Sequence, residues 1–141
     1  MRVYLTGPLC LEAGEHLLTE SALPGPQGRH LLGFLAAEHA RPLSRYELAG
    51  EIWPASLPAA WENSLKSLVS KVQAALSRAG LPATELIRSA FGACQFRLPR
   101  HGWVDIDTAV LSVHLAEAAL KSGDLDGAAG HAFVARLITA R

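Results

Sequence analysis

The sequence WENSLKSLVSKVQAAL, residues 61–76, carries a clear helical pattern. Its apolar residues recur every three or four positions, which is the spacing of one face of an α-helix. They are Trp61, Leu65, Leu68, Val69, Val72 and Leu76. The pattern predicts an amphipathic helix that ends near Gly80, because glycine followed closely by proline, here Pro82, is typical of a helix C-terminus.

The opposite face of this helix is unusual for a solvated surface, because it has few pairs of long, oppositely charged side chains. Its residues are Glu62, Asn63, Lys66, Ser67, Ser70, Lys71 and Gln73. Amides, hydroxyls and lysines can approach a DNA groove, where they contact phosphates and base edges. An ordinary amphipathic helix is the alternative, and the flanking segments decide between the two.

The N-terminal residues predict a small antiparallel sheet. Residues 2–11 are rich in strand formers, although Gly7-Pro8 interrupts them and points to an edge or a bulge. Ala13-Gly14 offers a tight turn, and residues 15–19 follow as a returning strand. The rigid loop at residues 23–26 ends this sheet.

Two helices are predicted between the sheet and residue 61. Pro26 suits the first turn of a helix that ends near residues 39–40. Ser44 and Glu47 have the spacing of a capping box, so a second helix begins there and stops at Pro54. We expect Trp53 and Trp61 to anchor the core between these helices, and Trp103 to seal the junction with the C-terminal part.

After the long helix the periodicity changes. Residues 86–98 alternate in polarity around Phe91-Gly92 and predict a β-hairpin. Residues 108–122 and 125–140 are then helical in pattern, and the short turn between them predicts an antiparallel pair. Asp105 and Asp107 are expected to cap the first of these helices.

Composition describes an ordinary globular chain. Half of the 141 residues are hydrophobic, 18% are charged, and 13 basic residues balance 13 acidic ones. This balance permits nucleic-acid binding without requiring it. Two cysteines, Cys10 and Cys94, are too few for a disulfide framework, so we expect buried thiols and a cytoplasmic location. No apolar run approaches the ~20 residues that span a bilayer, and no membrane partner is expected.

The motifs, taken in order, resemble those of one family. They are Leu5-Thr6-Gly7-Pro8-Leu9, Gly25-Pro26-Gln27-Gly28-Arg29, Glu51-Ile52-Trp53-Pro54, Asn63 with Leu65, Val69-Ser70-Lys71-Val72, Asp105-Ile106-Asp107 and Ser122-Gly123-Asp124. They are similar to motifs of Streptomyces-antibiotic-regulatory-protein (SARP) type transcriptional regulators. In that family an OmpR-like winged-helix DNA-binding domain precedes a bacterial transcriptional activation domain.

The resemblance implies an α+β fold: a winged helix-turn-helix followed by an α-helical hairpin. The winged helix, with its small antiparallel sheet, three helices and β-hairpin wing, would occupy residues 1–98. Residues 99–141 would be the first helical pair of an activation-type domain, either truncated or a natural short form. The partner implied is double-stranded DNA, with the third helix in the major groove and the wing on the adjacent minor groove or backbone. Such regulators also bind direct repeats as homodimers and contact RNA polymerase.

Several residues depart from the family pattern. Gln27, Glu62 and Gln73 stand where members commonly have a lysine or arginine, and Phe91-Gly92-Ala93 replaces the usual Pro-Gly-Tyr of the wing. Each lost phosphate contact removes about one counterion from the salt dependence of binding. We therefore expect weak DNA binding or a need for a second protomer.

The candidate DNA-binding residues lie mainly on the long helix. Asn63 can pair bidentately with adenine, Lys66 can reach guanine acceptors, and Lys71 is expected on a phosphate. Arg88 and Arg97 would equip the wing or belong to a solvated strand face, and Arg29 and Arg45 lie near helix N-termini that can hold phosphate. The full set is Asn63, Ser64, Lys66, Ser67, Ser70, Lys71, Arg88, Arg97, Arg29 and Arg45.

Nothing in the sequence indicates an enzyme or a cofactor. The six histidines have no metal-ligand spacing, and neither a phosphate-binding loop nor a nucleophile elbow occurs. A different function is nevertheless compatible with the same fold: a protein-interaction module that has lost DNA binding. Zero net charge, Glu62 and the missing cations favour it, whereas the polar face of the long helix opposes it.

Overall fold

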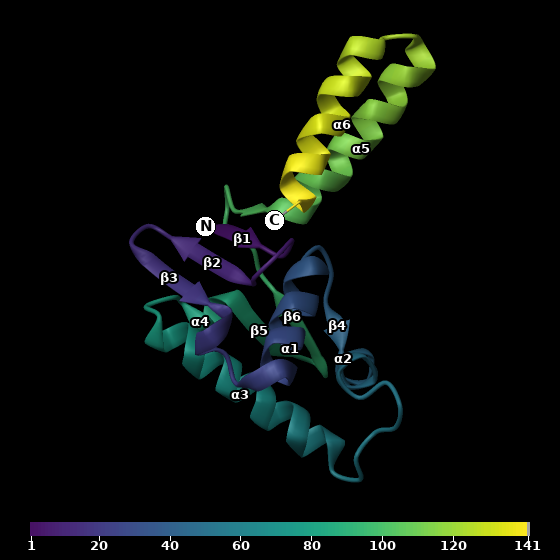
Figure 1. The fold of residues 1–141 in the computed structure, drawn as a ribbon. Coiled ribbons are helices and arrows are strands. Elements are labelled where there is room, and N and C mark those ends of the chain that lie inside the picture. The colour runs from purple at the N-terminus through teal and green to yellow at the C-terminus, as the bar shows by residue number, and fades with distance from the viewer. Residues whose placement is uncertain (141) are drawn as a thin grey trace.

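The computed structural model describes residues 1–140. Two small sheets and helices α1–α4 surround one core, and helices α5 and α6 project from it as an antiparallel pair (Figure 1). The α+β class and the order of sheet, three helices and hairpin agree with the sequence-based prediction. Among the described residues, no helix combines the length and hydropathy needed to cross a membrane.

The first sheet has the order β3-β2-β1-β7. Its strands are β1 (Arg2–Tyr4), β2 (Cys10–Ala13), β3 (His16–Thr19) and β7 (Trp103–Val104). Val3 pairs with Leu11 and Leu11 with Leu18, and all three side chains are buried on the face toward the helices. Strand β7 lies parallel to β1, so residues from beyond position 98 complete a sheet that begins at residue 2.

The helices and the second sheet follow. The helices are α1 (Gly25–Ala37), α2 (Arg45–Ile52), α3 (Trp61–Arg78) and the single turn α4 (Ala83–Leu86). Strands β4 (Leu43–Ser44), β6 (Ala93–Phe96) and β5 (Ile87–Ala90) form the sheet in that spatial order. The predicted hairpin is therefore confirmed, and it forms the wing. A short 3₁₀ turn, Glu20–Ala22, joins β3 to the loop before α1.

The core lies between α1, α3, the first sheet and the base of the wing. The apolar face of α3 is buried as predicted, through Leu65, Leu68, Val69, Val72 and Leu76. Each such side chain contributes about 1.5–3 kcal/mol when fully buried. The prediction that Trp53 and Trp61 anchor the core needs correction. Both side chains are only partly buried and pack against the edge of the core. Cys94 is buried as predicted, whereas Cys10 is only partly buried.

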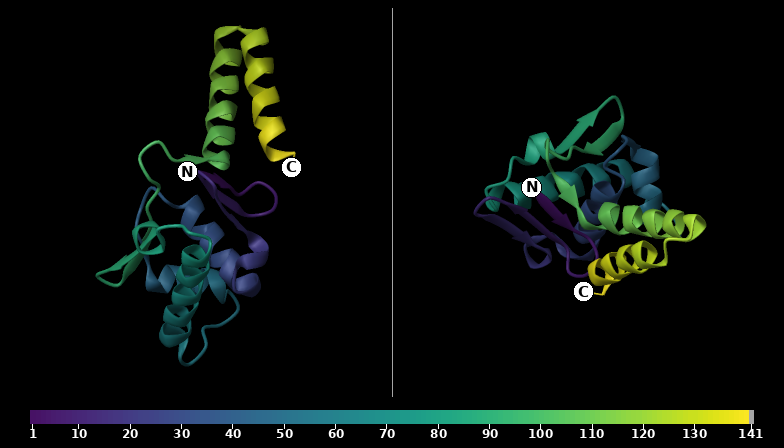
Figure 2. Two further views of the ribbon diagram at one scale, coloured as in Figure 1. Left: turned by 90° about the vertical axis from the view of Figure 1, so that its left-hand side faces the viewer. Right: turned by 90° about the horizontal axis from the view of Figure 1, so that it is seen from above.

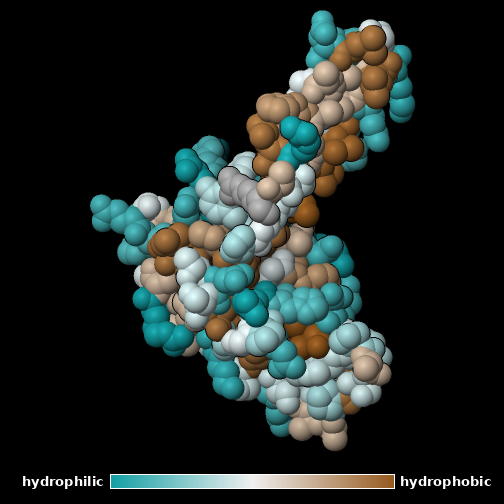
Figure 3. All heavy atoms as spheres, in the orientation of Figure 1, coloured by the Kyte–Doolittle hydropathy of each residue, from teal (hydrophilic) through white to brown (hydrophobic). Residues whose placement is uncertain are grey.

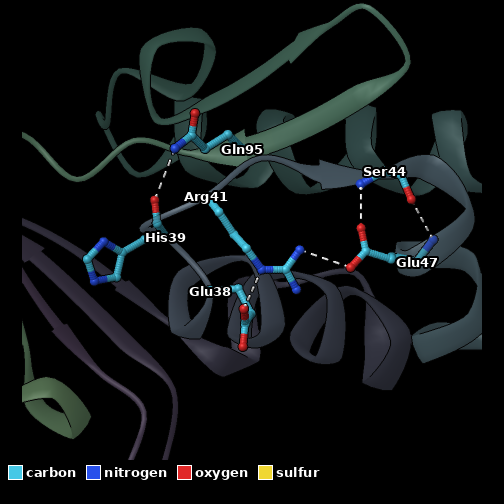
Figure 4. Close-up of polar contacts among 6 residues, drawn as sticks. All are labelled: Glu38, His39, Arg41, Ser44, Glu47 and Gln95. Atoms are coloured by element: carbon cyan, nitrogen blue, oxygen red, sulfur yellow. Dashed lines mark hydrogen bonds and ion pairs between the residues drawn. The ribbon is translucent and has the colours of Figure 1, made fainter.

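The start of α2 is fixed by the predicted capping box. The Glu47 amide donates to the Ser44 hydroxyl over 3.1 Å, and the Ser44 amide donates to the Glu47 carboxylate over 3.0 Å. Arg41 donates to both Glu47 and Glu38, at 2.9 and 3.0 Å (Figure 4). The bond from the Ser44 amide, and then that from Arg41, hold the pKa of the Glu47 carboxyl below its usual value. The positive charge of Arg41 is thus balanced by two carboxylates of the protein itself.

Helices α5 (Asp105–Ser122) and α6 (Leu125–Thr139) form the projecting hairpin. Gly123 ends α5 in the left-handed region at φ 81°, and the Asp124 carboxylate caps α6 by accepting from the Gly127 amide. The two helices meet through small buried residues, including Ala116 and Ala128. Their outer faces expose many large apolar side chains, visible as brown patches on the projecting arm in Figure 3.

A polar network joins the projecting hairpin to the first sheet. The fully buried Asp105 carboxylate accepts from the amides of Leu5 and Thr6, at 2.9 and 3.0 Å, and from the Thr6 hydroxyl at 2.6 Å. Burial raises the pKa of this carboxyl, but the hydrogen bonds outweigh burial and leave the pKa below its usual value. The N-cap position of α5 is Val104, although the Asp105 carboxylate does accept from the first-turn amide of Ile106 over 2.8 Å. The predicted capping role of Asp105 is therefore only part of what it does, because the same carboxylate also ties α5 to the segment after β1.

Two further contacts complete this junction. The Trp103 indole donates to the Thr108 hydroxyl over 2.6 Å, and its ring packs edge-on against Tyr4 with centroids 5.5 Å apart. The prediction that Trp103 seals the junction is thus confirmed. Asp107, also expected as a cap, instead lies 2.8 Å from the His39 imidazole after α1.

Candidate nucleic-acid interface

A groove separates α3 from the wing, and we name it the wing groove. Its floor is apolar, formed by Leu65, Val69, Ile87 and Cys94, and its rim is polar. The rim residues are Arg45 from α2, Glu62, Asn63, Lys66, Ser70 and Gln73 from α3, Thr84, and Arg88, Ser89 and Ala90 from the wing. Five predicted site residues thus lie together here: Asn63, Lys66, Ser70, Arg45 and Arg88.

Gln73 links the two walls of the wing groove. Its side-chain amide donates to the carbonyl oxygen of Ile87 over 3.0 Å, at the point where β5 begins. From the sequence, Gln73 is predicted to be a lost cation on the polar face, but its side chain joins α3 to the wing. No local pattern could reveal this contact, because the partner is a backbone atom of a different element.

Ser70 is less available for DNA than its position suggests. Its hydroxyl donates to the carbonyl oxygen of Lys66, one helical turn earlier, over 3.0 Å. This back-bonding occupies its single proton. Ser70 can therefore accept a hydrogen bond in the groove, whereas Lys66 remains an exposed donor.

The remaining candidates on α3 face the other way. Ser64, Ser67 and Lys71 line a second, shallower depression with Gln27, Trp53, Pro58, Leu68 and Asn63, and we name it the α1-side depression. Ser64 is partly buried there, whereas Ser67 and Lys71 are exposed. Asn63 borders both depressions. It therefore occupies the ridge of α3, the part that would enter a groove first.

Arg29 and Arg97 line neither depression. The Arg29 guanidinium lies 3.4 Å from the Glu20 carboxylate, and both side chains are exposed, so this ion pair contributes little to stability. Arg97 is exposed just after β6, where its backbone amide donates to the Leu86 carbonyl. The structure therefore separates these two arginines from the other eight predicted residues.

Arg45 brings α2 to the wing. Its backbone amide donates to the carbonyl oxygen of Gly92 over 3.1 Å, and β4 pairs with β6 immediately before it, Ser44 opposite Ala93. The start of α2 and the turn of the wing are thus held together. The wing groove carries three cations, Arg45, Lys66 and Arg88, against one acid, Glu62.

The turn of the wing holds Phe91, which is not among the site residues predicted from the sequence. Phe91 is fully exposed and adopts φ 51°, and Gly92 follows at φ 77°. Positive φ is routine for glycine, whereas other L-residues pay about 1–2 kcal/mol for it. The only sequence signal was the replacement of the family's Pro-Gly-Tyr by Phe91-Gly92-Ala93.

Comparison with known proteins places the fold. No family model and no curated protein sequence matches the chain. The structure is similar to that of Mycobacterium tuberculosis EmbR, determined in complex with a low-affinity phosphopeptide, with a TM-score of 0.70 and 20% identity. The chain is a winged helix-turn-helix with a helical hairpin attached. The match covers 97% of this chain but 35% of EmbR, so the chain spans about a third of that protein.

The described residues offer no obvious metal centre. Within residues 1–140, no three histidine, cysteine, aspartate or glutamate side chains gather in a way that could hold a metal ion. The arrangement at α3 and the wing offers instead hydrogen-bond donors and positive charge across an open surface. That chemistry suits a polyanion with exposed base edges.

Proposed function

We propose that the chain is a sequence-specific DNA-binding transcriptional regulator of the SARP type. Helix α3 would enter the major groove, and the wing would contact the adjacent minor groove or the backbone. The observation that carries this proposal is the wing groove, in which Asn63, Lys66, Arg45 and Arg88 from three elements surround one surface. The winged helix-turn-helix fold of the chain supports this mode of docking on DNA.

The two depressions beside α3 suggest different roles for their residues. Asn63 and Lys66 lie along the ridge and the wing side of α3, where an amide and an ammonium can reach base edges. Lys71 lies on the α1 side with the hydroxyls of Ser64 and Ser67, a combination that suits a phosphate of the opposite backbone. Arg45 and Arg88 would then contact phosphates of the DNA backbone on the wing side of α3.

The charges predict modest affinity for one protomer. Three cations and one acid line the wing groove, and Lys71 adds a fourth cation on the other side. Each neutralised phosphate contributes about −0.9 to the logarithmic salt slope, so one protomer gives a slope of about −3 to −4. Binding of two protomers to direct repeats would raise the affinity through linked contacts. We therefore propose a homodimer on DNA.

Residues 99–141 are proposed as the first part of an activation-type domain that contacts RNA polymerase. The exposed apolar side chains of α5 and α6, among them Leu111, Leu120 and Phe133, support a protein partner for this hairpin. The same observation favours the second candidate function, a protein-interaction module without DNA binding. Glu62 on the rim of the wing groove also favours that candidate.

Enrichment from fragmented genomic DNA separates the two functions. The purified chain is incubated with the fragments at low salt, where phosphate attraction is strongest, and the retained DNA is sequenced. The proposal predicts enrichment of a defined motif, arranged as a direct repeat. If the chain is instead an interaction module, no sequence should be enriched over input. The amount of DNA retained should then be the same for wild type and Lys66→Glu.

A further inference from the structure

The turn of the wing presents an aromatic ring that the fold itself does not use. Ala90 pairs with Ala93, so the hairpin turn consists of Phe91 and Gly92 alone. Both residues have positive φ, 51° and 77°, as a type I′ turn requires. Asn-Gly is the favoured pair in such turns, because asparagine adopts this conformation more readily than phenylalanine. Yet Phe91 is fully exposed, so its ring gains no burial in return.

We propose that Phe91 is an apolar wedge that inserts into the minor groove when the wing meets DNA. This inference rests on the proposed function and adds a specific contact to it. Proteins that bind the minor groove frequently place phenylalanine or leucine between base steps, which unstacks the bases and kinks the duplex. A side chain held outside the fold in a strained conformation is suited to that role.

The position of the turn supports DNA as its partner. The wing extends away from the body of the protein, visible in both views of Figure 2. Its turn is held by the hydrogen bond from the Arg45 amide to the Gly92 carbonyl, 3.1 Å long. Arg88 precedes Phe91 by three residues, which corresponds to about 10 Å along a strand. Arg45 and Arg88 thus belong to the two elements that adjoin the turn, and both line the wing groove, so positive charge is available on this side of the wing for a polyanionic partner.

The shape of the turn fits a narrow site. The minor groove is about 6 Å wide, so it admits only a slender element. The ring is flanked by Ala90, Gly92 and Ala93, whose side chains extend no further than a methyl group. A bulky neighbour on either side would block entry. The turn therefore presents one large apolar group on a thin support.

The test compares wild type with Phe91→Asn and Phe91→Trp on the enriched fragment. Phe91→Asn creates the favoured Asn-Gly turn, so its midpoint of thermal unfolding should equal or exceed that of wild type. Its affinity should fall roughly 10- to 100-fold, the range expected for loss of aromatic stacking on bases. The salt slope should stay unchanged, because the ring has no charge, whereas Arg88→Ala should reduce the slope by about one. Phe91→Trp should retain the affinity.

A fluorescent base reports the insertion directly. 2-Aminopurine placed at each step of the minor groove beside the motif should brighten at one step with wild type and not with Phe91→Asn. If Phe91→Asn binds as tightly as wild type with the same fluorescence, the wedge is overturned while DNA binding by α3 stands. If wild type retains no DNA fragment at low salt, the proposed function fails and the wedge fails with it.

Discussion

The side-chain amide of Gln73 on α3 donates a hydrogen bond to the backbone carbonyl oxygen of Ile87, 3.0 Å away, at the first residue of the wing. Ile87 is itself buried, so the carbonyl has little access to water. This contact joins the helix and the wing that form the wing groove. Residues that never touch DNA can therefore determine how both elements meet it.

Replacing Gln73 tests this relationship. Gln73→Ala leaves the Ile87 carbonyl without its donor, and Gln73→Glu removes the donor at nearly constant shape. Each should lower the free energy of unfolding by about 1–2 kcal/mol, measured by urea denaturation. Gln73→Ala should also weaken DNA binding without changing the salt slope, because it alters no charge. Gln73→Glu adds a carboxylate to the rim of the wing groove, so it should weaken binding further and make the salt slope shallower. Stability equal to wild type in both variants would show that the hydrogen bond contributes nothing.

Asn63 and Lys71 separate base contact from phosphate contact. Asn63→Ala should weaken the preferred site by about 1–3 kcal/mol and leave nonspecific DNA nearly unchanged. Lys71→Ala should weaken both kinds of DNA and reduce the salt slope by about one. Fluorescence anisotropy titrations on matched fragments measure both effects. Equal losses on specific and nonspecific DNA for Asn63→Ala would contradict a base contact.

The partial burial of Trp61 changes the stability expected from its replacement. Full burial of a large aromatic residue predicts a loss of 3–5 kcal/mol on truncation to alanine. Because Trp61 lies at the edge of the core, with the Tyr46 ring centroid 6.2 Å away, we expect about 2 kcal/mol for Trp61→Ala. Tyr46→Ala, at an exposed position, should cost less than half as much. A loss of unfolding free energy below about 0.5 kcal/mol for Trp61→Ala would contradict the packing of Trp61 against the core.

The Asp105 network predicts a pH-dependent junction. Its pKa is lowered in the folded state, so its stabilising effect is full above the ordinary aspartate pKa of about 3.9 and is lost as pH falls through the folded-state value. Asp105→Asn should cost about 1–3 kcal/mol near neutral pH, because the Thr6 and Leu5 amides lose a carboxylate acceptor. The difference between wild type and variant should shrink below about pH 4. A difference independent of pH would contradict an ionised Asp105.

Local patterns in the sequence predicted much of the fold. The apolar spacing of Leu65, Leu68 and Val72 predicted the buried face of α3, and the capping box of Ser44 and Glu47 predicted the start of α2. Both depend on contacts within one or two helical turns. The wing was equally predictable, because the alternation on both sides of Phe91-Gly92 indicates a hairpin independently of the rest of the chain.

Contacts between distant residues could not be predicted in this way. Asp105 bonds to backbone amides about a hundred residues earlier, and β7 pairs in parallel with β1, so neither partner lies in the local sequence. For the same reason the site was predicted only as one face of a helix together with four separate arginines, Arg29, Arg45, Arg88 and Arg97. Its division into the wing groove and the α1-side depression depends on where the wing and α1 pack against α3. The DNA-binding roles of these residues stay predictions.

The charge of the wing groove offers the most direct test of DNA binding. Glu62 is the only acid among the groove-lining residues of the described chain, and it stands one helical turn before Lys66. Affinity for the enriched fragment is measured across a salt series for wild type, Glu62→Lys and Lys66→Glu. If the groove holds DNA, Glu62→Lys should bind more tightly with a salt slope steeper by about one, and Lys66→Glu should bind more weakly with a shallower slope. Affinities and salt slopes that are the same for all three proteins would contradict DNA binding in the wing groove.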